Sequence, residues 1–582
     1  MNKRWIFVAV MALSGTATAA PFVYPAKWTS TPASAVKTGG TFNDYTLGDY
    51  KTVNPFESSE ADSIPLTLAA GSGLFTLDPT NLEYIPKMAE TYKISANKLV
   101  WTINLRSGIK WTDGSPVTAD DFVTSAKIHA DENVGSNEYS SFYVNNKPIK
   151  IEKVDKDTVK AIFPSVTADA IADLTYTVWP SKIFGPVYAA KGAAGIKGMW
   201  TISVDPKEVV SAGQWKYVGY RPGERAQFVK NPYFGEWNKD SAGKSLPYLD
   251  GLNVTLAKDL NSAFAQYLAG QIDAFAPRNT DDLAQIKKSI DAGQLKAVLK
   301  PSVSPAASSS WIVFNWNRKS EPFKQNLFRS TQFRRAMSYL VNRQAMVDIV
   351  YGGLAQPAYS SVYAVFGDWV SPALQKYDFN PEAAKKLLAS IGFTKKNSDG
   401  YLINNKKQVL EFDLNTNAGN NNREQMAKIF ADEAKKVGVK VNFKPIDFNS
   451  LVTALTSTGD DRKFDAILLG LSNGSPIFPL GINVDPCGTN LHAFNTSGKC
   501  ITPWETQVTA LFARGQAELD IAKRKTTARK IQDIQSSEQA FVYLVSPTWH
   551  ASWNARIKGE YPQGVMNAFV TQRDNALTWI NP

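Results

Sequence analysis

One short motif has the form that serine hydrolases use to present a nucleophile. Residues 470–474 read Gly-Leu-Ser-Asn-Gly, which matches G-x-S-x-G, and they follow an apolar run that predicts a strand. A nucleophile elbow must lead into a helix, but the next residues, SPIFPLG, contain two prolines and a glycine that cannot continue one. His492 and His550 lie downstream as bases, without a second signature. A secreted serine hydrolase is therefore a remote alternative, and we interpret Ser472 and Asn473 as part of a solvent-lined binding loop.

Metal and cofactor chemistry has no matching pattern. Three histidines and two cysteines are dispersed over 582 residues without the short spacings typical of metal ligands. No glycine-rich phosphate loop occurs. We therefore predict no metal site and no cofactor.

The N-terminus predicts export. Lys3 and Arg4 precede the apolar run 5–13 and the small-residue pattern at 17–19, so residues 1–20 are expected to be a cleaved signal peptide. The run is half the length of about 20 residues that a membrane helix needs. Neither cysteine lies near the cleavage point, so we expect a periplasmic protein without a lipid anchor. In an exported chain, Cys487 and Cys500, 13 residues apart, predict one disulfide.

Composition predicts a globular chain that does not bind nucleic acid. Hydrophobic residues make up 43% and charged residues 20%, and the length suits two or three domains. Removal of Lys3 and Arg4 lowers the formal net charge from +11 to about +9. The basic residues are scattered among acidic ones in short runs, which argues against nucleic acid as a partner.

Local patterns predict alternating strands and helices. Residues 21–40 are expected to form a flexible lead-in, because Gly, Ser, Thr and Pro dominate from 29 onward. Thr118 is the expected cap of a helix at 119–130, which follows an alternating strand at 99–105. Asn380 is the expected cap and Gly392 the expected stop of another helix. Further strands are predicted at 409–414, 439–446, 464–471 and 540–545, and further helices at 423–437, from 449, at 505–516 and at 520–535. The alternation between 409 and 471 indicates βαβ units in a mixed or parallel sheet.

Ordered blocks along the chain resemble the family 5 extracellular solute-binding proteins, the oligopeptide- and dipeptide-binding proteins of ABC importers. The resemblance covers nearly all of residues 36–582. Its most specific segment is LEYIPKMAETYKISANKLVWTINLRSGIKWTDGSPVTADDFVTSAK. The other matching blocks are residues 219–238 with 245–252, 265–275, 314–358, 377–393, 425–437 and 464–471.

The resemblance implies an α/β fold, a bilobed periplasmic-binding-protein clamshell of class II type with an extra subdomain and mixed sheets flanked by helices. Lobe 1 would comprise residues 41–305, with a subdomain inserted at about 75–205. Lobe 2 would comprise 306–544, and residues 545–582 would return to lobe 1. Two hinge crossings are expected near 301–314 and 541–553. The implied protein is a monomer without enzymatic activity, which closes on its ligand and delivers it to the permease subunits of an ABC importer in the inner membrane.

Short peptides are the ligand that the resemblance favours. In peptide-binding members, a loop after the strand at 464–471 carries a Trp and an Asp that holds the peptide's free amine. Residues 471–476 contain neither. A buried ammonium needs a paired charge, and Glu60 follows Asn54-Pro55 at the spacing where the family places ligand contacts.

The alternative ligand is an oligosaccharide on the same scaffold, or another small solute. Stacking on Trp215 and Trp311 and hydrogen bonds to Asn and Ser side chains would suit a sugar. The candidate ligand-binding residues are Ser58, Ser59, Glu60, Ser310, Trp311, Asn315, Ser472 and Asn473.

Overall fold

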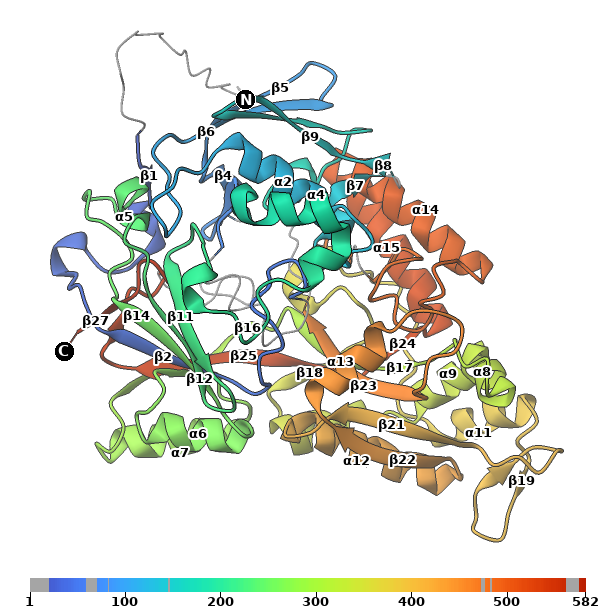
Figure 1. The fold of residues 1–582 in the computed structure, drawn as a ribbon. Helices are drawn as coiled ribbons and strands as arrows, with labels where there is room; N and C mark the ends of the chain where they lie inside the picture. Colours follow the sequence, from blue (N-terminus) through green and yellow to red (C-terminus); the bar gives the residue numbers. More distant parts are fainter. Residues whose placement is uncertain are drawn as a thin grey trace, which may run out of the picture.

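The computed structural model describes residues 20–58, 71–81, 83–144, 147–472, 477–481, 484–561 and 575–581. These residues form two α/β lobes joined by a pair of strands. Figure 1 shows lobe 1 at the left with its subdomain above, and lobe 2 at the lower right. Within these ranges, no helix is both long and apolar enough to cross a membrane. The bilobed α/β fold expected from the resemblance is confirmed.

Lobe 1 is built on a four-stranded sheet that joins distant parts of the sequence. The strand order is β11 (Trp215–Arg221), β12 (Arg225–Lys230), β14 (Gly251–Leu256) and β2 (Thr41–Thr46). Strand β2, from the start of lobe 1, lies beside β14, which comes much later in the sequence, because the two strands pair in parallel. Helices α6 (Leu260–Leu268) and α7 (Thr280–Asp291) lie beside this sheet (Figure 1). The side chains of Asp259 and Asn279 cap these helices by accepting backbone N–H groups.

The subdomain contains its own antiparallel sheet. Its order is β5 (Ala89–Ile94), β6 (Val100–Leu105), β10 (Thr158–Ile162) and β9 (Lys150–Asp155). Helix α2 (Ala119–His129) packs beside α4 (Ser181–Lys197). The backbone N–H of Thr118 donates to Asp121 Oδ2 over 2.8 Å, which closes a capping box at the predicted start of α2. The predicted strand at 99–105 and helix at 119–130 are thus confirmed to within one residue.

The start of the mature chain differs from the expected flexible lead-in. Strand β1 (Phe22–Val23) pairs in parallel with β13 (Asn238–Lys239). Phe22, Tyr24 and Trp28 are only 5%, 2% and 1% exposed. The prediction of flexibility for 21–40 is wrong for this part, because burial of three aromatic side chains outweighs the turn-forming residues that follow. The predicted signal segment up to residue 19 lies outside the described residues.

Lobe 2 is organised around a mixed five-stranded sheet, as its βαβ pattern predicts. The order is β22 (Lys440–Ile446), β21 (Glu411–Asn417), β23 (Ala466–Ser472), β17 (Ser308–Phe314) and β24 (Phe541–Tyr543). The first three strands are parallel, and β17 runs antiparallel to both of its neighbours. The helices of this lobe include α11 (Pro381–Ser390), α12 (Asn421–Val437), α13 (Phe448–Thr456), α14 (Pro503–Ala517) and α15 (Ile521–Glu538).

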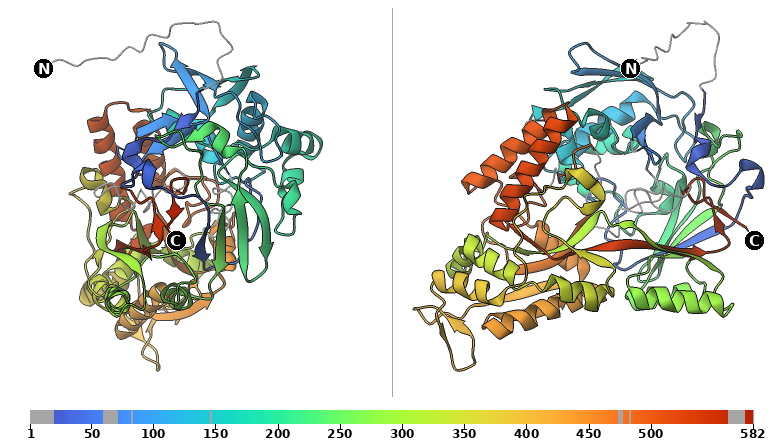
Figure 2. Two further views of the ribbon diagram at one scale, coloured as in Figure 1. Left: turned by 90° about the vertical axis from the view of Figure 1, so that its left-hand side faces the viewer. Right: turned by 180° about the vertical axis from the view of Figure 1, so that it is seen from behind.

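Two adjacent strand crossings form the hinge. Strand β16 (Ala297–Pro305) leads into β17, and β24 leads back into β25 (Val545–Asn554). Strand β25 pairs with β16 and β15 (Ala274–Phe275) of lobe 1 and with β18 (Ala355–Pro357) of lobe 2. Figure 2 shows it running from one lobe to the other. Where the crossings meet, Ser546 Oγ donates to Ser308 O over 2.7 Å and Ala306 N donates to Pro547 O over 2.9 Å.

Candidate functional site

Two of the predicted ligand-binding residues, Ser310 and Ser472, lie where the lobe 2 sheet joins the hinge. Strand β17 begins there and β23 ends there, so Ser308 lies opposite Ser472, and Ser310 lies opposite Gly470. Ser472 is exposed and Ser310 is buried. Asn473 lies outside the described residues.

The same end of the sheet faces lobe 1. The carboxyl ends of β21 and β23 and the start of α13 lie at this edge. Asn449, in the first turn of α13, donates from Nδ2 to the carbonyl oxygen of Asp49 in lobe 1 over 3.2 Å. Open α/β sheets bind ligands outside the carboxyl ends of their parallel strands, so this edge suits a ligand held between the lobes.

The structure places Trp311 and Asn315 inside lobe 2. Trp311 is 2% exposed, and its ring packs edge-to-face on Phe541 at 5.0 Å between centroids. Asn315 is fully buried, and its Nδ2 donates to the carbonyl oxygens of Arg462 and Phe464. These side chains are used in packing and internal hydrogen bonds. Trp311 and Asn315 are therefore not available to a ligand in this conformation.

Trp215 is also buried, at 1% exposure. Like Trp311, it offers no ring face on which a sugar could stack in this conformation. Trp215, Trp311 and Asn315, the candidate contacts for an oligosaccharide outside residues 472–473, are thus all buried.

On the lobe 1 side, the segment before Ser58 is held in a fixed turn. Asn54 is fully buried, and its Oδ1 accepts the backbone N–H of Phe56 over 3.0 Å while its Nδ2 donates to Ile196 O over 2.8 Å. Ser58 N donates to Asn54 O over 3.1 Å, and Ser58 is 6% exposed. Ser59 and Glu60 lie outside the described residues. Their roles stay predictions.

The sequence did not predict two buried polar side chains beside the hinge, Tyr363 and Asp485. Tyr363 donates its hydroxyl to Leu471 O over 2.8 Å, which ties it to the end of β23. Burial raises the pKa of the nearby Asp485 to about 6. Its carboxylate accepts the backbone N–H of Gly481 over 2.7 Å and a hydrogen bond from Gln535. Asp485 precedes Pro486 in the sequence and lies beyond the loop at 471–476, the segment in which the resemblance implies an acidic residue.

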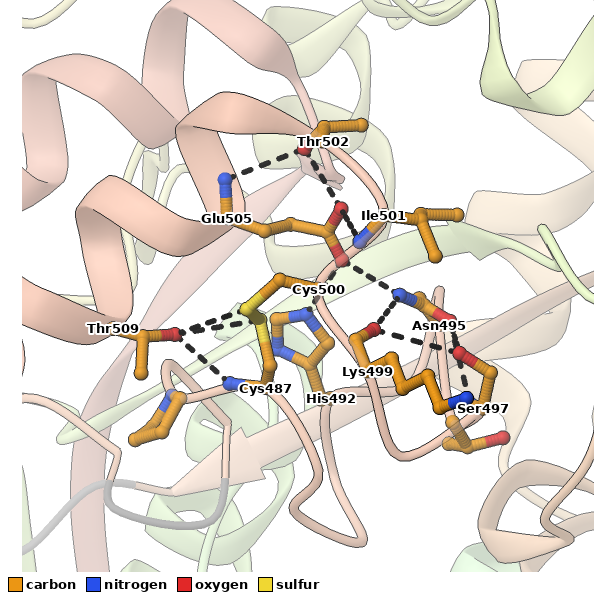
Figure 3. A network of polar contacts seen from close by, with 12 residues as sticks. Cys487, His492, Asn495, Ser497, Lys499, Cys500, Ile501, Thr502, Glu505 and Thr509 are labelled. Atoms are coloured by element: carbon orange, nitrogen blue, oxygen red, sulfur yellow. Dashed lines mark hydrogen bonds and ion pairs between the residues drawn. A yellow bond between two sulfur atoms is a disulfide. The ribbon is translucent and has the colours of Figure 1, made fainter.

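A disulfide and a buried His–Glu pair stabilise the loop that precedes α14 (Figure 3). Cys487 and Cys500 are bonded, with Cα atoms 5.4 Å apart. Ligand atoms of Cys487, His492 and Glu505 lie within 4.8 Å of one another, the spacing of a metal site. The sulfur is committed to the disulfide, however, and His492 and Glu505 hydrogen-bond to each other and to the loop. This donor set does not fit a metal ion.

Comparisons with known proteins agree with this architecture. The profile of the bacterial extracellular solute-binding proteins, family 5 middle region, matches residues 83–480. A "Probable ABC transporter-binding protein" of Deinococcus radiodurans is 47% identical over 593 residues, which covers 99% of this chain and 100% of that protein. The oligopeptide-binding protein AppA of Bacillus subtilis is 26% identical over 394 residues, 66% of this chain and 65% of AppA.

Solved structures share the fold. AppA from Bacillus subtilis in complex with a nonapeptide has a TM-score of 0.78 at 21% identity, covering 94% of this chain and 100% of the AppA chain. MelB from Agrobacterium fabrum C58, in complex with stachyose, has a TM-score of 0.79 at 21% identity, covering 94% of this chain and 85% of the MelB chain. The protein described here therefore belongs to the bacterial extracellular solute-binding proteins of family 5.

Proposed function

We propose that this protein is the periplasmic substrate-binding component of an ABC importer, which captures short peptides by hinge closure and delivers them to a membrane permease. The observation that carries the proposal is the pair of lobes joined by the β16–β17 and β24–β25 crossings. Similarity over the full length to a probable ABC transporter-binding protein supports the transport role. The predicted signal peptide supports export; the monomeric state and the absence of a lipid anchor are part of the proposal.

Peptides are the proposed ligand because relatives named for peptides match in both sequence and fold. A peptide can be held through its main chain as an added strand, so that its side chains contribute little to affinity. The proposed contacts are Ser58, Ser59 and Glu60 from lobe 1 and Ser472 and Asn473 from lobe 2. Glu60 is proposed to pair with the peptide's ammonium group.

Native mass spectrometry of the purified protein tests the ligand class. The protein is mixed with an equimolar random tetrapeptide library and with stachyose in parallel. We expect tetrapeptide adducts, and weaker adducts from the same library after amino-acetylation. Binding of stachyose without any tetrapeptide adduct would overturn the peptide assignment and leave the transport role intact.

The proposal contains no chemical step. The parent protein should therefore turn over ester substrates only at the background rate, and a fluorophosphonate should leave Ser472 unlabelled. Covalent labelling of Ser472 by a fluorophosphonate would contradict the proposal and favour the serine hydrolase.

A further inference from the structure

The two lobes touch at a second place, away from the hinge. The subdomain segment between β10 and the short helix α3 (Ala170–Asp173) reaches the last turn of α14. Ala168 N donates to Gln516 O over 2.7 Å, and Thr167 Oγ1 donates to the same oxygen over 3.2 Å. Figures 1 and 2 both show α14 and α15 beside the subdomain and apart from the β16–β25 crossing. A hinge motion that separates α14 from the subdomain would break this contact.

Two carboxylates are buried next to this contact. Asp169 is 8% exposed and Asp173 is 9% exposed. Asp169 Oδ1 accepts no hydrogen bond from the part of the chain that the structure describes. Arg524 of α15 is the cation that acts on Asp169. Its guanidinium makes its hydrogen bonds to the backbone carbonyl oxygens of Glu518, Leu519 and Ile477.

The surroundings favour the neutral form of both acids. Burial raises the pKa of Asp169 to about 6, although Arg524 opposes the shift. Burial and the charge of Asp169 raise the pKa of Asp173 well above its usual value. From β4 (Glu83–Pro86), Tyr84 faces both acids, and burial and their charges raise its pKa to about 12. On the lobe 2 side of the contact, the negative charges of Glu518 and Asp520 favour the charged form of Arg524.

We propose that hinge closure is coupled to proton uptake by Asp169 and Asp173, so that the protein closes more readily in an acidic than in a neutral periplasm. In the open form, water reaches segment 167–173 and the carboxylates ionise near their usual value of 3.8. In the closed form, each acid holds its proton up to a higher pH than in the open form; the proton comes from solvent and returns to it on opening. This inference rests on the proposed function, which includes hinge closure, and adds a dependence of closure on pH.

The sign of the effect follows from the raised pKa values. Below about pH 4 both forms are protonated, and closure carries no ionisation penalty. As the pH rises toward 6, the open form loses protons that the closed form retains, so closure becomes less favourable by up to about tenfold per pH unit for each acid. For Asp169, this decrease in the ratio of closed to open molecules levels off above about pH 6. For Asp173 it continues to higher pH, because the pKa of this acid is raised further.

Single-molecule fluorescence energy transfer measures closure directly and without added ligand. Dyes are attached at Val154→Cys in the subdomain and Ile349→Cys in lobe 2, where the native side chains are 53% and 68% exposed. Between pH 5 and pH 8 we expect the ratio of closed to open molecules to fall at least tenfold. Asp169→Asn combined with Asp173→Asn should make the ratio independent of pH. Glu152→Gln, which removes an exposed carboxylate from the same subdomain, is the control and should follow the parent protein.

The outcomes separate the coupling from the hinge itself. A ratio that responds to the tetrapeptide library but not to pH would overturn the proton coupling and leave the proposed function standing. A ratio that responds to neither pH nor the tetrapeptide library nor stachyose would overturn hinge closure, and with it both proposals. If the double variant does not fold, the pH response of the parent protein alone decides the question, and each single Asn variant should show a reduced response.

Discussion

Replacement of Glu505 with glutamine is expected to destabilise lobe 2 by about 3 to 5 kcal/mol, the cost of removing the charged acceptor from a buried hydrogen-bond network. Glu505 is fully buried. Its carboxylate accepts hydrogen bonds from Asn495 Nδ2 at 2.7 Å, Thr502 Oγ1 at 2.7 Å, Ile501 N at 3.1 Å and His492 Nε2 at 3.3 Å. A glutamine side chain keeps the size of glutamate but has a single acceptor oxygen. Its amide nitrogen would therefore face donors in place of accepting from them, and hydrogen bonds to a charged group contribute about 1.5 to 3 kcal/mol each.

Urea denaturation followed by tryptophan fluorescence, with the disulfide oxidised in both proteins, measures this difference. Glu382→Gln is the matched control, because Glu382 pairs with Lys385 on the surface with its side chain 74% exposed. Burial alone would raise the pKa of Glu505, but the hydrogen bonds from His492, Asn495 and Thr502 together outweigh it and lower the pKa below 4.5. The stabilisation is therefore present above that pH and is lost as the pH falls below it. Equal unfolding midpoints for the two variants at pH 7, or a difference that grows in acid, would refute the reasoning.

Three further outcomes are expected. Reduction of the Cys487–Cys500 disulfide should lower stability by about 3 kcal/mol on the chain-entropy model and disturb local order more than ligand binding; two thiols that titrate in the unreduced, denatured protein would contradict the pairing. Glu60→Gln should weaken peptides with a free amino terminus by about 2 to 5 kcal/mol and acetylated peptides much less, as calorimetry can measure; unchanged peptide affinity would remove Glu60 from the site. Small-angle scattering should give a smaller radius of gyration with a bound peptide than without it, and an equal radius at saturation would argue against closure.

The elements that the sequence predicted well are those with local signals at both ends. Helix α11 shows this: the predicted cap Asn380 accepts the backbone N–H of Ala383 over 2.9 Å, and the predicted stop Gly392 follows the helix at a φ of +95°. The βαβ alternation also predicted the parallel part of the lobe 2 sheet. Such signals act over a few residues, so they can be recognised without knowledge of the tertiary structure.

The candidate site was harder to predict, because burial and long-range pairing decide it. Nothing local distinguishes Trp311, which is buried against Phe541, from a tryptophan that lines a cleft. The contact between Thr167 and Gln516 joins residues 349 positions apart. Asp169 is an ordinary acid in the sequence, and only the tertiary structure, with Tyr84 of the subdomain and Arg524 of lobe 2 near it, shows that it is buried.

The path of β25 also determines the order in which the lobes can be completed during export. Lobe 2 obtains all five strands of its sheet from residues 308–543, an uninterrupted stretch of chain. In lobe 1, β25 is the middle strand between β15 and β16, so those two strands have no common partner until residues 545–554 arrive. A chain that emerges amino terminus first can therefore complete the five-stranded sheet of lobe 2 while β15 and β16 of lobe 1, and β18 of lobe 2, still wait for β25 as their partner. The strand that permits the hinge motion is thus among the last to assemble, and a truncation before residue 545 would leave lobe 1 with unpaired edges that favour aggregation.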